Sequence, residues 1–315
     1  MKAIQIHEYG GLDVLKLEEI PRPEPAAGEL LVRVLAAGVN PVDWKTRAGR
    51  GVSKLYGDKR FPLVVGWDVS GNVEEIGPDV AGFAAGDAVF GMPRFPEVAA
   101  AYADYVTVPA DEVVLKPDSI THVQAAALPL VALTAWQALF ETADLQEGQS
   151  VLIHAAAGGV GHVAVQLAKW KKAFVIGTAS ERNAGYLAEI GVDLFVDYQA
   201  QRFEDVVADI DVVLDGMSGE TRARSWGVLK PGGMLVSIQG APDLETAEKF
   251  GVRAAGILVY PNGNQMAQIA ELADRGIIKP HVDAIYPLSE AAQAQEHVFS
   301  GHTRGKVVLV PDHET

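Results

Sequence analysis

Short runs of alternating apolar and polar residues fill the first 120 positions of the chain, and turn residues separate them. Examples are ELLVRVLAAGVN, WDVSGNVEEIG, DAVFGM and DYVTVPADEVVLK, which are bounded by Gly, Pro and Asp. Alternation with a period of two is typical of β-strands with one buried face. We therefore expect residues 1–120 to form a compact, β-rich, barrel-like domain.

From about residue 121 the pattern changes to helical segments that alternate with short apolar runs. The segment AAALPLVALTAWQALFETA predicts helix, and the runs SVLIH, AFVIG, DLFVDY, DVVLDG and GGMLVSIQG predict buried strands. This alternation predicts an α/β domain with a doubly wound parallel sheet at residues 121–260. The last segment, 261–315, has two helical stretches and a terminal strand, GKVVLV, and is expected to return to the first domain.

The segment VLIHAAAGGVGHVAVQLAKW, residues 151–170, predicts a strand, a glycine turn and a helix in immediate succession. It matches the dinucleotide fingerprint G-x-G-x-x-G with alanine in the first place. A helix that begins at such a turn presents free N–H groups and the positive end of its dipole to a pyrophosphate. We therefore predict a dinucleotide site, with an ordinary glycine-rich turn as the alternative. The candidate residues are Ala156, Gly158, Gly159, Val160 and Gly161.

The acidic residue that holds the adenosine ribose in NAD-specific sites is missing at the end of the second predicted strand. The segment VIGTASERN has Thr178 and Ser180 there, followed by Arg182. A hydroxyl and a guanidinium suit an additional phosphate, so we predict NADP as the cofactor. Tyr198, after the third strand, is expected to flank the same phosphate or to be a packing residue. Glu181 is interpreted as a solvated residue at a helix start.

Composition narrows the class of protein further. The 315 residues are 49% hydrophobic and 21% charged, which is typical of two globular domains. A net charge of −15 argues against nucleic acid and anionic membranes as partners. The start, MKAIQIHEYGG, lacks the apolar run of a signal peptide, so we expect a cytoplasmic protein that acts on a small molecule. The absence of cysteine excludes disulfides, thiol catalysis and thiolate zinc sites, and the eight histidines have no metal-binding spacing.

Several segments together resemble the medium-chain dehydrogenase/reductase superfamily, in particular its zinc-free quinone oxidoreductase and alkenal reductase branch. The resemblance covers nearly the whole chain and implies a GroES-like catalytic domain, a Rossmann domain and a homodimer formed through the Rossmann sheets. Zinc-dependent members have a cysteine, and a histidine followed by glutamate, where this chain has Asn40, and Trp67 with Asp68. No catalytic zinc is therefore expected. The segments are AAGVNPVDWKTRAG (36–49), GWDVSGNVEEIG (66–77), GDAVFG (86–91), LTAWQAL (133–139), AAAGGVG (155–161), LKPGG (229–233) and GKVVLV (305–310).

The resemblance also implies the residues around the substrate. Asn40 is expected beside the nicotinamide, or alternatively to be a turn residue before Pro41. Trp44 is expected to line the substrate pocket, or to be a core residue. Lys45 can donate to an oxyanion or a phosphate, although a lone lysine is more often solvent-exposed. Tyr56 is one of the tyrosines whose chemistry suits a proton donor.

Further cofactor contacts are implied on both predicted domains. Thr134 is expected near the nicotinamide and the phosphates, although a helical threonine can simply bond to its own backbone. The residues after the fourth and fifth strands are expected to line the adenosine and nicotinamide portions respectively. The basic turn before the terminal strand is expected to approach the cofactor, or to be solvated. These candidates are Thr134, Gly216, Ile238, Gln239, Val259, Tyr260, Gly305 and Lys306.

The motifs together predict a zinc-independent, NADPH-dependent reductase that transfers hydride to a quinone or to the C=C bond of an α,β-unsaturated carbonyl. Alcohol oxidation in the zinc-dependent relatives relies on the metal, whereas a conjugated acceptor has its own electron sink. One alternative is an enoyl-thioester reductase. Another is a non-catalytic, crystallin-like protein that binds NADPH.

Overall fold

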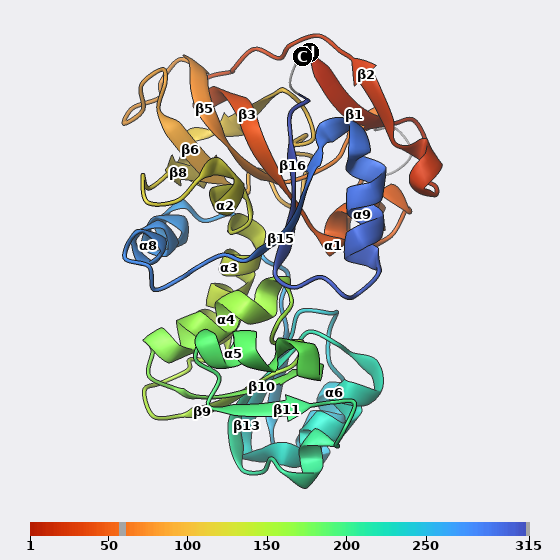
Figure 1. Ribbon diagram of the computed structural model, residues 1–315, viewed down its shortest axis with the longest axis vertical. Coiled ribbons are helices and arrows are strands. Elements are labelled where there is room, and N and C mark those ends of the chain that lie inside the picture. The colour runs from red at the N-terminus through yellow and green to blue at the C-terminus, as the bar shows by residue number, and fades with distance from the viewer. Residues whose placement is uncertain (57–60, 313–315) are drawn as a thin grey trace. The chain divides into compact units, whose positions relative to one another are not determined.

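The structure is a computed structural model that describes residues 1–56 and 61–312 (Figure 1). The chain folds into two compact units. The first contains Met1–Leu130, Tyr260–Gly276 and Pro280–Thr315, and the second contains Val131–Val259 and Ile277–Lys279. One unit contains a mixed sheet in which most strand pairs are antiparallel, and the other contains a parallel sheet, so the predicted α/β class is confirmed.

The first unit contains ten of the described strands and four helices. The strands are β1 (Lys2–Ile6), β2 (Lys16–Glu19), β3 (Glu29–Val39), β4 (Leu63–Val64), β5 (Asp68–Ile76), β6 (Ala88–Gly91), β7 (Tyr105–Pro109), β8 (Val113–Leu115), β15 (Val282–Pro287) and β16 (Lys306–Val310). The helices are α1 (Pro41–Arg47), α2 (His122–Ala126), α8 (Gly263–Asp274) and α9 (Ala291–Phe299). One sheet has the order β2-β1-β4, and the other has the order β15-β16-β3-β5-β6-β8, with β7 paired to β3. The end of the chain thus completes the N-terminal sheet.

Strand β3 lies at the centre of the larger sheet and positions the functional residues of this unit. It pairs with β5, β7 and β16. Leu30, Leu31 and Val32 are all fully buried, so β3 does not have the single buried face that strict alternation predicts. A strand with neighbours on both edges and other elements over both faces has no side left for solvent. Its last residue, Val39, is followed by Asn40, which is the N-cap of α1.

The second unit is a six-stranded parallel sheet flanked by helices. Its strands are β9 (Ser150–Ile153), β10 (Phe174–Ala179), β11 (Leu194–Asp197), β12 (Ile210–Asp215), β13 (Leu229–Ser237) and β14 (Arg253–Gly256). Its helices are α4 (Gly159–Trp170), α5 (Ala184–Glu189), α6 (Gly219–Ser225) and α7 (Leu244–Lys249), and α3 (Pro129–Trp136) with the π-helix η5 (Gln137–Thr142) leads into it. The strand order is β11-β10-β9-β12-β13-β14. Because the order reverses at β9, ligands are expected at the carboxyl end of this strand.

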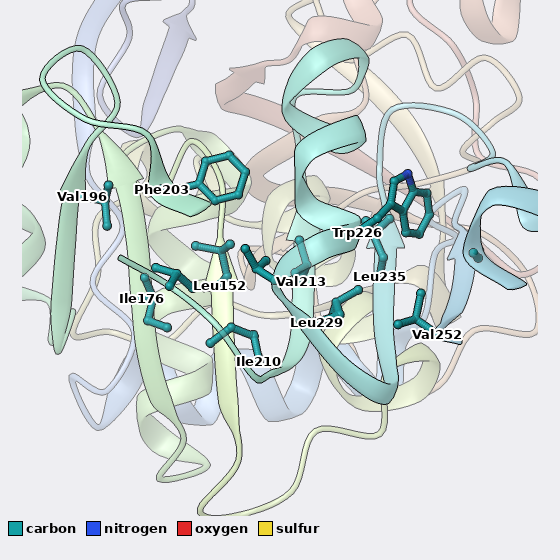
Figure 2. Close-up of a cluster of buried hydrophobic side chains, with 13 residues drawn as sticks. Leu152, Ile176, Val196, Phe203, Ile210, Val213, Trp226, Leu229, Leu235 and Val252 are labelled. Carbon is teal, nitrogen blue, oxygen red and sulfur yellow. The ribbon is translucent and has the colours of Figure 1, made fainter. Parts of the chain in front are cut away.

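A row of apolar side chains crosses this sheet and forms its core (Figure 2). Ile176 of β10 pairs with Leu152 of β9, which pairs with Val213 of β12, which in turn pairs with Leu235 of β13. Trp226 belongs to the same buried cluster. Burial of each such side chain contributes roughly 1.5–3 kcal/mol, so this row stabilises the pairing of the four strands.

Helix α4 covers the sheet through Val163 and Leu167, which are both fully buried. Trp170 follows the same helical spacing, yet its side chain is 40% exposed. Its ring lies 5.9 Å from the ring of Trp136 and 6.0 Å from that of Phe140, measured between centroids. The large indole at the end of the helix therefore packs on other aromatic rings.

Candidate functional site

The glycine turn lies directly after β9 and begins α4. The N–H of Gly158 donates to the carbonyl oxygen of Ala155 at 2.9 Å, and Ala155 itself has a φ of +52°. A Cβ atom at Gly161 would lie 2.2 Å from the same oxygen, so only glycine allows the helix to approach the strand this closely. Gly159 and Val160 form the partly exposed first turn of α4, where helix geometry leaves N–H groups without intrahelical acceptors.

The residues predicted to bind an additional phosphate lie at the ends of the neighbouring strands β10 and β11. Ser180 follows β10, and its Oγ accepts a hydrogen bond from Asn183 Nδ2 at 3.3 Å. Arg182, two residues on, is exposed. The N–H of Tyr198 donates to the carbonyl oxygen of Ala179 at 3.3 Å, which holds this exposed tyrosine beside the end of β10. The structure thus brings the predicted hydroxyl, guanidinium and phenol to adjoining strand ends.

Thr178, another predicted cofactor contact, is buried and bonds within the protein. Its Oγ1 lies 3.1 Å from His154 Nδ1, and His154 Nε2 lies 2.9 Å from Ser225 Oγ. Burial lowers the pKa of His154 to about 4, so the imidazole is neutral at neutral pH. This chain of hydrogen bonds connects β9, β10 and α6 just below the glycine turn.

The other predicted contacts of this unit are spread over the remaining strand ends. Gly216 follows β12 directly, and Ile238 and Gln239 follow β13, where all three are partly exposed. Thr134 lies on α3 and Val259 follows β14, and both are buried. Carboxyl ends of parallel strands are where this fold binds ligands, so the placement is compatible with a cofactor.

In the first unit, Asn40 and Lys306, which the sequence predicts near the cofactor on separate grounds, contact each other. The Lys306 ammonium donates to Asn40 Oδ1 and, at 2.9 Å, to the carbonyl oxygen of Val39. Asp68 Oδ2 accepts from Asn40 Nδ2 at 2.8 Å and lies 3.3 Å from Lys306 Nζ. All three side chains are buried. Strand pairing explains the meeting, because Val307 opposes Val39 and Asp68 opposes Gly38.

Burial dominates the electrostatics of this network. It raises the pKa of Asp68 and lowers that of Lys306, while the attraction between the two charges opposes both changes. Asp68 Oδ1 also accepts the N–H of Leu130 at 2.8 Å, so both carboxylate oxygens have partners. The ammonium likewise uses three donors on three oxygens, which is the full capacity of a lysine. The network therefore leaves Asn40 and Lys306 with internal partners.

A second buried carboxyl group adjoins the first. Asp43 Oδ2 accepts the hydroxyl of Tyr102 at 2.6 Å and the N–H of Asn40 at 2.7 Å. Burial raises the pKa of Asp43 to about 7, with smaller opposing effects from these hydrogen bonds and from Lys306. Sequence reasoning gave no role to Asp43 or Tyr102. The alanine-rich context of Tyr102 contains no local signal for such a pairing.

The remaining predicted residues of this unit differ in accessibility. Trp44 and Lys45 are half-buried on α1, and the Trp44 ring packs edge-on against Phe299 of α9 with 5.0 Å between centroids. The Tyr56 hydroxyl is buried and donates to the carbonyl oxygen of Pro96. Tyr260, by contrast, is 44% exposed.

Gly305 has a structural requirement of its own. Its φ is +64°, and a Cβ atom there would lie 2.2 Å from the carbonyl oxygen of His281. Only glycine adopts this backbone without strain or collision. The turn before β16 therefore needs glycine whether or not it approaches a cofactor.

Comparison with known proteins places this geometry among dehydrogenases and reductases. The family described as alcohol dehydrogenase GroES-like domain matches residues 26–118, and the family described as zinc-binding dehydrogenase matches residues 190–309. The chain is 35% identical over 321 residues to the chloroplastic NADPH-dependent alkenal/one oxidoreductase of Arabidopsis thaliana, covering 99% of this chain and 80% of that protein.

Solved structures agree with the sequence relatives. The quinone oxidoreductase from Coxiella burnetii is similar with a TM-score of 0.92 and 38% identity, covering 99% of both chains. The Escherichia coli quinone oxidoreductase complexed with NADPH is similar with a TM-score of 0.88 and 28% identity, covering 99% of this chain and 100% of that one.

Zinc, which one of these family descriptions names, does not fit the residues present. The chain has no cysteine, and among residues 1–56 and 61–312 no group of three His, Cys, Asp or Glu side chains could hold a metal ion. The oxygens of Asn40 and Asp68 are already bonded to the Lys306 ammonium. A zinc ion prefers thiolate and imidazole ligands, and here it would have to displace a built-in cation. We therefore derive no step that uses zinc.

Proposed function

Since this chain belongs to the medium-chain dehydrogenase/reductase superfamily, in its quinone oxidoreductase and alkenal reductase branch, we propose which of its residues bind the cofactor and which contact the hydride acceptor. The predicted class of activity is confirmed by the relatives: NADPH-dependent reduction of a quinone or of an α,β-unsaturated carbonyl compound. The observation that carries the residue assignments is the glycine turn at β9 beside a strand end that has Ser180 and Arg182 in place of an acid.

The second unit binds NADPH in this proposal. The first turn of α4 holds the pyrophosphate through its N–H groups, and the close approach permitted by Gly161 brings the helix N-terminus to it. Ser180, Arg182 and Tyr198 bind the 2′-phosphate, where the guanidinium forms charge-assisted hydrogen bonds. Bound NADPH supplies the hydride. Gly216, Ile238 and Gln239 line the rest of the cofactor from their strand ends.

The first unit orients the acceptor in this proposal. Trp44 and Lys45 are the predicted acceptor contacts that the structure leaves partly accessible, whereas Asn40 and Tyr56 are buried with their polar side-chain atoms bonded inside the protein. We therefore assign acceptor contact to Trp44 and Lys45. Burial lowers the pKa of Lys45. In its protonated form this side chain is suited to stabilising negative charge on a carbonyl oxygen.

The acceptor itself is activated by conjugation. Addition of hydride to the β-carbon of an enone or enal gives an enolate, and its protonation at the α-carbon completes the reduction of the C=C bond. A quinone takes the same hydride and one proton to become a hydroquinone. In both cases the protein must orient the acceptor and exclude water rather than polarise an unactivated bond.

Stopped-flow oxidation of NADPH with a panel of quinones, enones and enals tests the proposal. We expect acceptor-dependent loss of NADPH absorbance, with conjugated acceptors far faster than their saturated analogues. Simple alcohols with NADP⁺ serve as the negative control. Tight NADPH binding without turnover of any acceptor would instead favour a non-catalytic binding protein.

We further propose that two copies associate through β14. This strand is the last in the order of the parallel sheet, and exposed apolar residues, Phe250 and Leu258, lie on either side of it in the sequence. An open strand edge with apolar surroundings is a ready surface for pairing with a second sheet. Sedimentation analysis should give a dimer, and Leu258→Lys should shift it to a monomer.

The cytoplasmic location stays a prediction. No helix in the described ranges is long and apolar enough to cross a membrane.

A further inference from the structure

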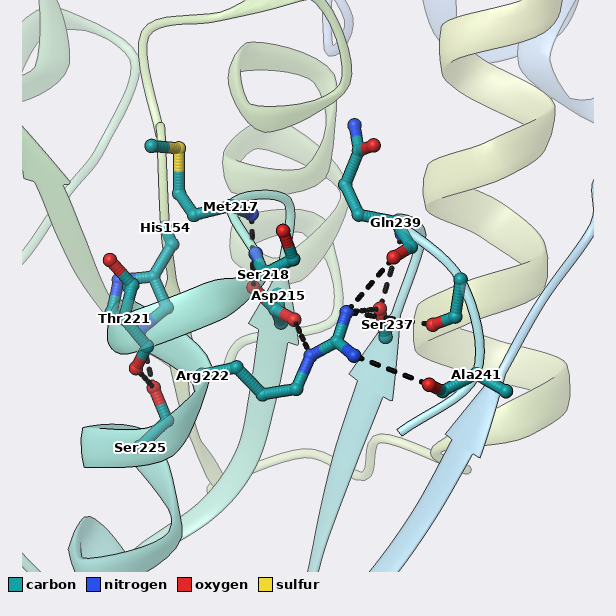
Figure 3. Close-up of polar contacts among 11 residues, drawn as sticks. His154, Asp215, Met217, Ser218, Thr221, Arg222, Ser225, Ser237, Gln239 and Ala241 are labelled. Atoms are coloured by element: carbon teal, nitrogen blue, oxygen red, sulfur yellow. Dashed lines mark hydrogen bonds and ion pairs between the residues drawn. The ribbon is translucent and has the colours of Figure 1, made fainter. Parts of the chain in front are cut away.

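Arg222 on α6 connects the ends of two neighbouring strands of the second unit. Its Nε donates to Asp215 Oδ2 at 2.5 Å at the end of β12, and its Nη2 donates to Ser237 Oγ at 2.6 Å at the end of β13. Figure 3 shows the guanidinium between these two strand ends. The Arg222 side chain is 14% exposed and that of Asp215 is fully buried. An ion pair so shielded from water is stronger than one at the surface.

The same ion pair also holds the two loops that follow these strands. Arg222 Nη2 donates to the carbonyl oxygen of Gln239 at 3.1 Å, and Nη1 donates to that of Ala241 at 3.3 Å. Asp215 Oδ1 accepts the N–H groups of Met217 at 2.9 Å and Ser218 at 2.8 Å. The Arg222–Asp215 pair therefore holds the backbone of both loops through hydrogen bonds.

The backbone of Ser218 shows that the first loop is held in place. Its φ is +61°, in the left-handed region that residues other than glycine adopt at an energetic cost. Such a conformation persists where surrounding contacts fix it. The hydrogen bond from the Ser218 N–H to Asp215, together with the ion pair to Arg222, supplies these contacts.

We propose that Arg222 is a positioning residue for the cofactor, which nothing in the sequence pattern indicated. Gly216 on one loop is assigned to the adenosine portion and Gln239 on the other to the nicotinamide portion, so Arg222 fixes the spacing between two halves of one binding surface. The inference rests on the proposed function, because only a bound dinucleotide gives this spacing a role. A lysine at position 222 keeps the charge but lacks the planar fork that reaches both strand ends.

The test measures the Kd values of NADPH and NADH by fluorescence titration for the unmodified chain, Arg222→Met and Arg222→Lys. We expect Arg222→Met to raise both Kd values by about 10- to 100-fold, as loss of several charge-assisted hydrogen bonds implies. The ratio of the two Kd values should not change, because the 2′-phosphate is assigned to Ser180 and Arg182. Arg222→Lys should recover part of the affinity, and kcat with saturating NADPH should fall less than kcat/KM for NADPH.

Arg224→Met is the matched control, because Arg224 lies on the same helix but pairs with Glu204 at 3.2 Å. It should leave both Kd values unchanged. If Arg222→Met does not fold, Ser237→Ala removes only one of the oxygen atoms to which the Arg222 guanidinium donates. This variant should raise both Kd values in the same proportion as each other, and by a smaller factor than Arg222→Met. Unchanged Kd values in the folded Arg222 variants, or an equal rise in Arg224→Met, overturn the proposal.

Failure of the proposed function is a separate result. An unmodified chain that binds NADPH but reduces no acceptor refutes the reductase activity. The titrations still decide the role of Arg222 in that case, because they measure binding and require no turnover.

Discussion

Asp43→Asn should abolish a pH dependence of stability that is built into the first unit. The Asp43 carboxyl group is fully buried, and Oδ2 accepts the hydroxyl of Tyr102 and the N–H of Asn40. Oδ1 has no hydrogen-bond partner among the residues that the structure describes. Burial raises the pKa from 3.8 to about 7, and repulsion from Asp68 adds to the rise while attraction to Lys306 opposes it. A proton on Oδ1 removes the charge that burial disfavours.

The sign and size of the effect follow from the two pKa values of Asp43. Between pH 3.8 and about 7 the folded protein binds this proton and the unfolded chain does not. The contribution of the proton to the free energy of unfolding is therefore fully present below pH 3.8 and is lost as the pH rises through about 7. The total loss is roughly 4 kcal/mol, because each tenfold change in proton affinity is worth about 1.4 kcal/mol. Of this, roughly 2–3 kcal/mol falls between pH 5 and pH 8.

Urea unfolding followed by tryptophan fluorescence, at several pH values between 5 and 8, measures the difference between Asp43→Asn and the unmodified chain. An asparagine accepts the same two hydrogen bonds but places an amide without a partner at the Oδ1 position, which costs roughly 1–3 kcal/mol at every pH. The variant should therefore be the less stable protein at pH 5 and gain relative to the unmodified chain by roughly 2–3 kcal/mol at pH 8.

A matched substitution at an exposed position, Asp118→Asn, should leave the pH profile unchanged. Other groups that titrate in this range affect both proteins, so the difference between the profiles isolates Asp43 and the groups coupled to it. Parallel profiles for Asp43→Asn and the unmodified chain would refute the reasoning, because they would show that Asp43 does not take up a proton in this range on folding.

Three further predictions test the remaining assignments. Arg182→Ala should raise the Kd of NADPH by about 10- to 100-fold and leave that of NADH nearly unchanged in fluorescence titrations, because it removes a charge-assisted contact to the 2′-phosphate alone; an equal loss for both cofactors would defeat the assignment. Lys306→Met leaves Asp68 buried without its ionic partner and should cost roughly 3–5 kcal/mol in urea unfolding. Adding Asp68→Asn should recover part of this loss, and a double variant no more stable than the single one would contradict the pairing. Gly161→Ala places a Cβ atom 2.2 Å from a backbone carbonyl oxygen and should abolish NADPH binding or folding, whereas Gly185→Ala, where a Cβ meets no atom within 4 Å, should do neither.

The arrangement of the second unit could be predicted from the sequence because its determinants are local. Apolar runs of four to six residues specify buried parallel strands. The glycine turn specifies a close approach that Gly161 satisfies through contact with a residue only six positions away. The absence of an acid after β10 is likewise visible in a single short segment. Trp170 shows what periodicity does not predict. The helical spacing indicates on which face of α4 this side chain lies, but not that it packs against Trp136 and Phe140.

Arg222 and the Asp43–Tyr102 pair could not be predicted for a physical reason. Each depends on partners that lie in other elements: Arg222 contacts Ser237, 15 residues away, and Asp43 contacts Tyr102, 59 residues away. An arginine on a short helix has the same local pattern whether it is solvated or forms a buried ion pair. Only the register of β12 and β13, and the approach of Tyr102 to α1, decide between these outcomes.

The network around Lys306 contains Asn40 and Asp68, which by the resemblance stand where zinc-dependent members have a cysteine and a glutamate. The sequence predicts Asn40 and Lys306 each near the cofactor. They lie 266 positions apart, and only the pairing of β16 with β3 shows that they bond to each other. The place is thus occupied by the Lys306 side chain, which belongs to the chain and is held by Asn40, Asp68 and the carbonyl of Val39. This side chain has no vacant coordination position and all three of its donors are bonded internally, so it cannot activate an alcohol as a metal ion does. It can fix the end of β3 and the start of α1, which carries Trp44 and Lys45. This is sufficient for a reductase whose acceptors are activated by their own conjugation.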